Sequence, residues 1–234
     1  MGKCCFMTNL NYLYNPDAAK DTFNESYFID KKLGFQVIEH GTILPHKSVN
    51  IPGKWHFGLC GIADSDGNFI ESSSLHNGVG GTYTPPPESI KHSSQTVIYL
   101  ALFYRVWGHD LTDNIRRVWF LKSEFMKQFK NCPIVYIPYQ DGTLTIDKQP
   151  SLKRLLEILE VDVERLQPIT QPTQFDKIIL PDGSFLSPNN PVKGFTTEYK
   201  EMIDRVRDFA LKNRTPTSSK KIYFFNGNKG IAFE

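Results

Sequence analysis

The residues best suited to chemistry lie together in one stretch, Val106–Phe120 (VWGHDLTDNIRRVWF). On a helix, His109 and Asp113 are four positions apart and share a face, so the carboxylate can orient the imidazole. An imidazole oriented in this way can take a proton from a substrate hydroxyl near neutral pH. We therefore interpret His109 and Asp113 as candidate catalytic residues. A structural alternative stays open, in which Asp113 pairs with Arg116 or Arg117 on a solvated surface and the imidazole only begins the helix.

Larger side chains of the same stretch are candidates for holding a substrate. Arg116 and Arg117 suit a phosphate or a carboxylate, because a guanidinium presents paired donors to such anions. Trp107 and Trp119 suit the flat face of a ring-shaped substrate. We interpret all four as candidate substrate-binding residues. Core packing is the alternative for Trp119, which is adjacent to an apolar stripe.

Other reactive or metal-binding side chains are dispersed along the chain. The remaining histidines lack the spacing of a metal site: His40, His46, His56, His76 and His92. The cysteines form no C-x-x-C pair, and we expect them to be reduced thiols: Cys4, Cys5, Cys60 and Cys132. Asp64-Ser65-Asp66 has the letters of a metal-binding Asp-x-Asp site but falls in an expected hairpin turn. The sequence therefore predicts no metal site and no cofactor.

Two elements are expected to position the candidate residues. The β-branched and aromatic run Thr96–Phe103 predicts a buried strand, and Asp110–Phe129 predicts a helix. One face of that helix would join the core: Leu111, Ile115, Val118, Phe125 and Phe129. The opposite, polar face would carry His109, Asp113, Arg116 and Phe120. Because ligands of open α/β sheets bind at the carboxyl ends of strands, His109 is expected at such a site.

The rest of the chain predicts an α/β fold with a mostly parallel sheet and flanking helices. Strands and helices alternate, which implies crossover connections. Further strands are predicted over Pro133–Pro138, Asp176–Pro181 and Lys221–Phe225, and further helices over Ser151–Glu160 and Thr196–Lys212. Residues 1–95 predict an irregular β-rich region. It contains a strand over Phe35–His40 and a hairpin of Leu59–Ala63 and Asn68–Ser72 around Asp64–Gly67.

Composition narrows the class of protein. The chain has 234 residues, enough to bury a sizeable core, and a formal net charge of +2 from 27 basic and 25 acidic residues. That balance argues against binding to nucleic acid through phosphate contacts. The longest apolar run, Thr96–Trp107, is interrupted by Arg105 and is shorter than the roughly 20 residues of a membrane span. The first residues lack an apolar signal segment, so we expect a cytoplasmic protein.

The stretch Leu102–Leu121 (LFYRVWGHDLTDNIRRVWFL) resembles the motif of the glycosyltransferase family 61 proteins, above all the bacterial members described as capsular polysaccharide biosynthesis proteins. The positions that match the motif are His109, Asp113, Arg117 and Trp119. Three further segments resemble the same bacterial branch: Gly41–Pro45 (GTILP), Tyr83–Pro87 (YTPPP) and Lys220–Phe225 (KKIYFF).

The resemblance implies an inverting glycosyltransferase of the GT-B arrangement, in which two Rossmann-like domains face a cleft. Such an enzyme moves xylose, arabinose or N-acetylglucosamine from a nucleotide-sugar donor to a glycan acceptor, usually without a metal. His109, oriented by Asp113, would be the base that deprotonates the acceptor. The implied partners are the nucleotide sugar and the glycan acceptor, and peripheral association with a membrane stays open.

Two departures from the family pattern modify this expectation. In the family, the strand that Lys220–Phe225 resembles opens a second domain, but this sequence has nine residues after Phe225. We therefore expect residues 96–220 to be a Rossmann-like acceptor-side domain and residues 221–234 the start of a missing donor-binding domain, without which the chain is inactive. Asp110 stands where the family has an apolar or aromatic residue, and its charge is expected to disturb the start of the helix. The alternative is a non-catalytic glycan-binding or regulatory module.

Overall fold

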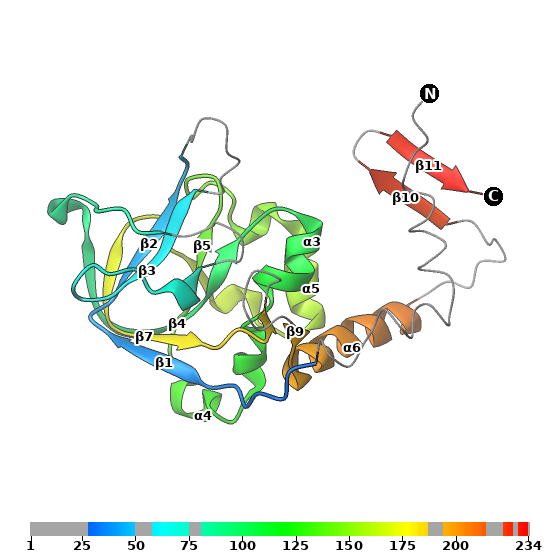
Figure 1. Ribbon diagram of the computed structural model, residues 1–234, viewed down its shortest axis with the longest axis horizontal. Coiled ribbons are helices and arrows are strands. Elements are labelled where there is room, and N and C mark those ends of the chain that lie inside the picture. Colours follow the sequence, from blue (N-terminus) through cyan, green and yellow to red (C-terminus); the bar gives the residue numbers. More distant parts are fainter. Residues whose placement is uncertain are drawn as a thin grey trace.

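A seven-stranded mixed sheet organises the protein (Figure 1). The computed structural model describes residues 28–49, 58–74, 81–186, 194–213, 222–226 and 229–233. The strands of the sheet are β1 (Phe35–Glu39), β2 (Thr42–Lys47), β3 (Leu59–Ala63), β4 (Lys91–Phe103), β5 (Ile134–Pro138), β6 (Leu166–Pro168) and β7 (Thr173–Pro181). They lie in the order β3-β2-β7-β4-β5-β6, and β1 also pairs with β7.

The centre of the sheet is parallel, as the alternation of strands and helices predicted. β4 pairs in parallel with β7 on one side and with β5 on the other, and β5 pairs in parallel with β6. The antiparallel strands β1, β2 and β3 come from the region predicted to be irregular and β-rich. They extend the same sheet, so strands from both sides of the expected boundary at residue 95 belong to it.

Helical segments follow most strands of the parallel part. The longer ones are α5 (Pro150–Ile158) and α6 (Thr197–Lys212), which match the predicted helices. The shorter segments are η2 (Glu71–Ser73), η3 (Pro87–Ser89), α3 (Trp107–His109), η4 (Asp110–Asn114), η5 (Val118–Lys122), α4 (Met126–Phe129), η6 (Ile146–Lys148) and η7 (Val163–Arg165), where η denotes a 3₁₀ or π turn. Among the described residues, no helix is long and apolar enough to cross a membrane.

Apolar side chains pack on both faces of the sheet, which explains the continuous apolar run in β4. On one face, Ile98 and Leu100 join a core that includes Leu155 of α5 and Met202 of α6. On the other face, alternate residues of β4 pack against side chains of β2 and β3, among them the buried Ile43. The site described below lies where this doubly covered strand ends.

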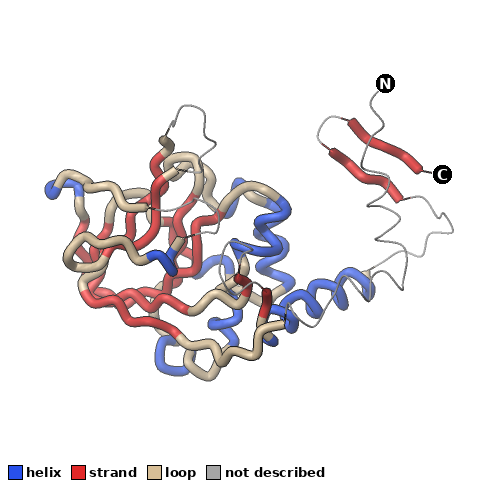
Figure 2. Tube along the Cα trace, viewed as in Figure 1, coloured by secondary structure: helices blue, strands red, loops and turns tan. Residues whose placement is uncertain are grey.

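The prediction of one continuous helix over Asp110–Phe129 is wrong. The segment is divided into the π-helical turn η4, the 3₁₀ turn η5 and the short helix α4 (Figure 2). An amphipathic surface helix needs one solvated face. Here Arg116 and Phe120, predicted on that face, are buried together with Ile115 and Val118. The segment is enclosed on several sides, so contacts with neighbouring strands decide its backbone conformation.

The predicted strand Lys221–Phe225 corresponds to β10 (Ile222–Asn226), with Lys221 outside the described residues. Within the described chain, β10 pairs antiparallel with β11 (Lys229–Phe233) and forms a separate two-stranded sheet. It therefore does not extend the parallel sheet. Another small sheet pairs β8 (Phe185–Leu186) with β9 (Gly194–Phe195). The predicted hairpin is present in reduced form: β3 is followed by the Asp64–Gly67 turn, and its second strand is a single bridge at Phe69.

Candidate active site

The candidate residues lie at the carboxyl end of β4, where ligands of parallel α/β sheets usually bind. β4 ends at Phe103, and the chain turns through Tyr104 into α3 and η4. Two backbone hydrogen bonds form this turn: the N–H of His109 donates to the carbonyl of Val106 at 2.8 Å, and the N–H of Val106 donates to the carbonyl of Tyr104 at 3.0 Å. The imidazole is thus carried by a short, tightly bonded connection.

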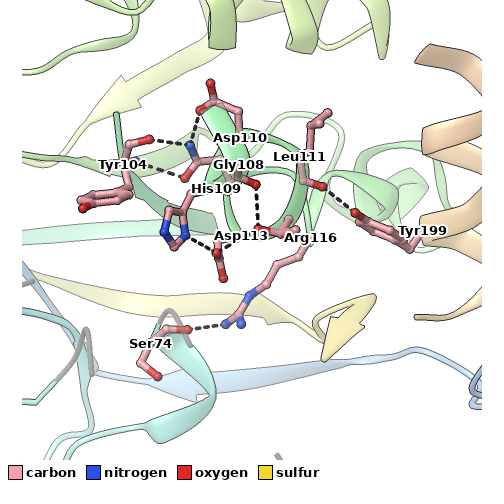
Figure 3. Close-up of polar contacts among 11 residues, drawn as sticks. Ser74, Tyr104, Gly108, His109, Asp110, Leu111, Asp113, Arg116 and Tyr199 are labelled. Carbon is pink, nitrogen blue, oxygen red and sulfur yellow. Dashed lines mark hydrogen bonds and ion pairs between the residues drawn. The ribbon is translucent and has the colours of Figure 1, made fainter. Parts of the chain in front are cut away.

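His109 and Asp113 are in direct contact, as their spacing predicted (Figure 3). Nδ1 of His109 lies 2.6 Å from Oδ2 of Asp113. The Asp113 side chain is 1% exposed, whereas the His109 side chain is 22% exposed. Because a carboxylate accepts, Nδ1–H donates and the lone pair of a neutral imidazole is on Nε2. The alternative of an Asp113 surface ion pair is therefore wrong, and the predicted catalytic roles stay predictions.

Two further contacts hold this pair in place. The Thr112 hydroxyl lies 3.1 Å from Oδ2 of Asp113 and 3.1 Å from the carbonyl of Gly108, so it donates to one of them at a time. The ring of Tyr104 meets the His109 ring edge to face, with 4.8 Å between centroids. Carboxylate and aromatic contacts together restrict the tilt of the imidazole, as positioning groups do in preorganised sites.

The π-helical turn η4 is fastened to the end of β4 by Asn114. Its Nδ2 donates to the carbonyl of Tyr104 at 2.9 Å and to Oδ1 of Asp110 at 2.7 Å, and its Oδ1 accepts from the N–H of Tyr104 at 3.1 Å. Asp110 is buried, and burial raises its pKa from 3.8 to about 6, against the opposing effects of Asn114 and His109. Asp110, whose charge was expected to disturb the start of the helix, thus lies in the π-helical turn η4. Such π-helical turns are frequent at functional sites.

Arg116 and Arg117 are interior residues, and the expectation that they face a substrate is corrected accordingly. Arg117 Nε donates to the carbonyl of Pro181 and Nη1 to that of Leu100, each at 2.9 Å, while Nη2 donates to the carbonyl of Ser72. Arg116 Nη2 donates to the carbonyls of Ser72 and Ser74. These bonds join β4, the end of β7 and η2. The guanidinium groups therefore position the segments around the site.

The buried arginines also shape the electrostatics of Asp113. Burial lowers the pKa of Arg117, the neighbouring Arg116 lowers it further, and the negative charge of Asp113 acts in the opposite direction. Burial likewise lowers the pKa of Arg116, again opposed by Asp113. By the same interaction, both guanidinium groups stabilise the ionised carboxylate.

The two candidate tryptophans differ in what the structure describes. Trp119 is buried in the core, and its Nε1 donates to the carbonyl of Asp182 at 2.9 Å. Core packing, the alternative reading of Trp119, is therefore the correct one. Trp107 is in α3, but its side chain lies outside the described residues. His56 and His76 also lie outside them.

A second histidine–aspartate contact, which sequence reasoning missed, lies near the first. Asp141 follows β5, and its N–H donates to Nδ1 of the buried His46 at 3.2 Å. The ring of Tyr139 contacts the His46 ring at 4.5 Å and the Tyr104 ring at 4.6 Å, measured between centroids. Since Tyr104 also contacts His109, the two imidazoles are joined by two tyrosines. The turn residues YQDG directly after a buried strand were the available signal.

Comparisons of the chain with protein-family models, with curated proteins and with solved structures found no match. Within the described ranges, no three His, Cys, Asp or Glu side chains gather in a way that could hold a metal ion. The contact between His109 and Asp113 is an arrangement suited to proton transfer.

Proposed function

We propose that this protein is the acceptor-side part of an inverting glycosyltransferase, in which His109 is the general base. The observation that carries the proposal is the 2.6 Å contact between His109 Nδ1 and the buried Asp113 carboxylate, at the carboxyl end of a parallel strand. The resemblance of Leu102–Leu121 to the family 61 glycosyltransferases supplies the reaction class.

In the proposed reaction, Nε2 of His109 takes the proton of an acceptor hydroxyl. The hydroxyl oxygen attacks the anomeric carbon of the donor sugar, and the bond to the nucleotide diphosphate breaks, with its electron pair leaving on the diphosphate. Asp113 stabilises the imidazolium that forms, as the orienting carboxylate of a catalytic triad does. The charges of the buried Arg116 and Arg117 attract the negative charge of Asp113.

The proposal gives the described residues the acceptor side of a GT-B enzyme and assigns the nucleotide sugar to a second domain outside them. We place the reaction in the cytoplasm, in the synthesis of a capsular or other surface polysaccharide. Release of nucleotide diphosphate from a panel of nucleotide sugars by the chain alone would contradict the assignment of the donor to a second domain. It would leave the role of His109 intact.

Deletion of the gene, and replacement of the gene by a variant, test the function itself in the cells that carry it. We expect deletion of the gene to remove one type of glycosyl residue from the surface glycans, as measured by composition and linkage analysis. His109→Ala should reproduce the deletion at an unchanged protein level. Unaltered glycans in the deletion strain would overturn the transferase. Altered glycans in that strain, but normal ones with His109→Ala, would overturn the role of the base.

A non-catalytic glycan-binding module makes a different prediction in the same cells. It would show binding of oligosaccharides by the purified chain, no change with His109→Ala, and no missing glycosyl residue after deletion. No described contact favours that module over the transferase, because a carboxylate-oriented imidazole is not needed for binding alone.

A further inference from the structure

The groups around Tyr139 and Asp141 form a second polar surface next to His109. Tyr139 directly follows β5, and its half-buried ring lies between the rings of Tyr104 and His46. The rings of Tyr104 and Tyr139 meet edge to face. Tyr104 is buried and touches both Tyr139 and His109, so one side chain fixes the spacing between this surface and the proposed base.

The carboxylate of Asp141 is exposed yet firmly held. Its side chain is 59% exposed. The N–H of Ser48 donates to Oδ1 at 2.7 Å, and the Ser48 hydroxyl donates to Oδ2 at 2.9 Å. On its other side, the backbone N–H of Asp141 donates to Nδ1 of His46 at 3.2 Å. Exposed carboxylates are usually free to move, so this one has been given a fixed direction by residues of another strand end.

The backbone that carries Asp141 is unusual. Gln140, Asp141 and Gly142 have φ angles of 53°, 52° and 85°, all in the left-handed region. Non-glycine residues in that region cost free energy and cluster at binding sites, where the surroundings hold them in place. Two hydrogen bonds close the loop, from Thr143 N–H to the carbonyl of Gln140 and from Leu144 N–H to that of Tyr139. The loop is therefore built to present Asp141 beside Tyr139.

We propose that Tyr139 and Asp141 form the subsite for the acceptor sugar, with an uncharged sugar ring packed against the part of the Tyr139 ring that its neighbours leave exposed and its hydroxyl groups hydrogen-bonded to Asp141. This inference rests on the proposed function and names the substrate class of the same site. An aromatic ring offers an apolar face for the C–H groups of a sugar, and a carboxylate makes stronger hydrogen bonds to hydroxyl donors than a neutral acceptor does.

The charge of Asp141 determines the class of sugar. Burial alone would raise the pKa of Asp141, but the hydrogen bonds from Ser48 and the neighbouring His46 together outweigh that effect and leave the pKa below its ordinary value. The group is thus an anion near neutral pH, and it repels a carboxylate on the ligand. The subsite selects neutral sugars over uronic acids.

Binding of oligosaccharides to the purified chain tests the subsite. The probes are xylotriose, cellotriose and chitotriose as neutral ligands and triglucuronate as the anionic one, measured by saturation-transfer NMR and calorimetry. We expect at least one neutral trisaccharide to bind and triglucuronate to bind at least about tenfold more weakly. Failure of all neutral probes to bind, or equal binding of triglucuronate, would overturn the proposal.

Variants then locate the binding. Asp141→Asn should weaken the neutral ligand about tenfold or more, since a charged acceptor is lost. Asparagine tolerates the left-handed conformation, so this variant keeps the loop intact. Tyr139→Ala should abolish binding, while Tyr139→Phe, which retains the ring, should restore it to within about threefold of wild type. Asp147→Asn is the matched control, because it removes an exposed carboxylate from η6 nearby, and it should bind as wild type does.

The two proposals fail in different ways. If Asp141→Asn and Tyr139→Ala bind the trisaccharide as tightly as wild type, the subsite is wrong, whatever the cell experiment with His109→Ala shows. If both variants lose binding but deletion of the gene leaves the glycans unaltered, the subsite stands as a sugar-binding site and the transferase is wrong.

Discussion

The buried Asp110 carboxyl makes the stability of this protein depend on pH in a predictable direction. Its pKa is raised from 3.8 to about 6 by burial. Between these values the folded state binds the proton more tightly than the unfolded state does. Stability is therefore greatest below the unfolded pKa and is lost as the pH rises through the folded pKa. The Asp110 carboxyl therefore favours the folded state most when it is protonated, and its ionisation opposes folding.

The size of the effect follows from the two pKa values. One pKa unit corresponds to 1.36 kcal/mol, and linkage gives a loss of about 2 kcal/mol from Asp110 between pH 4.5 and 7.5. Asp110→Asn removes the ionisation, and the amide oxygen can still accept from Nδ2 of Asn114. We expect the difference in unfolding free energy between the variant and the wild type to shift by about 2 kcal/mol in favour of the variant as the pH rises from 4.5 to 7.5.

Urea unfolding of both proteins at several pH values measures this difference. The other titrating groups are shared, so their contributions largely cancel when the two curves are subtracted. Asp147→Asn, the control, removes an exposed carboxylate that pairs with Lys153 at the surface, and it should change the unfolding free energy by less than about 1 kcal/mol at every pH. A flat difference for Asp110→Asn as well would refute the reasoning, because it would mean that Asp110 ionises in the folded state as readily as in the unfolded chain.

Three further substitutions test the packing that positions the site. Arg117→Lys should lower the unfolding free energy by about 3 kcal/mol or more in urea titrations, because lysine leaves buried carbonyls without donors. The control Arg207→Lys, at an exposed position, should change the unfolding free energy by less than about 0.5 kcal/mol. Gly142→Ala should destabilise more than Gly67→Ala does, since both have positive φ but only the former would contact a neighbouring side chain; equal midpoint shifts would contradict this. Leu155→Ala should cost about 2–5 kcal/mol by thermal unfolding, and a cost under about 1 kcal/mol would remove that residue from the core.

Much of the parallel half of the fold could be predicted because the apolar residues of each element follow the pattern of one type of secondary structure. The apolar stripe of α5 and the short apolar runs of β5 and β7 each have an unambiguous pattern. The segment after β4 also fits the period of a helix, yet it is divided. Its arginines find carbonyl acceptors on Ser72 and Pro181, which are distant in sequence. Such acceptors cannot be read from local spacing, so buried arginines look like surface ones.

The two halves of the site show the same contrast. His109 and Asp113 are four residues apart, and a local rule was enough to predict their contact. His46 and Asp141 are 95 residues apart, and their contact depends on how β2 approaches the end of β5. Neither the residue types nor their spacing in the sequence indicates that β2 lies near the end of β5. Only the turn chemistry after β5 marks the position in the sequence.

Sugar transfer in an extract tests the central claim most directly. Extracts of cells that lack the gene would receive purified wild-type chain or His109→Ala, together with radiolabelled nucleotide sugars, and incorporation into glycan would be measured. The extract supplies whatever holds the donor. We predict that wild-type chain restores incorporation and that His109→Ala restores it at least about 100-fold more slowly, which is the contribution of a general base. Incorporation at the wild-type rate with His109→Ala would contradict the assignment of this residue as the base.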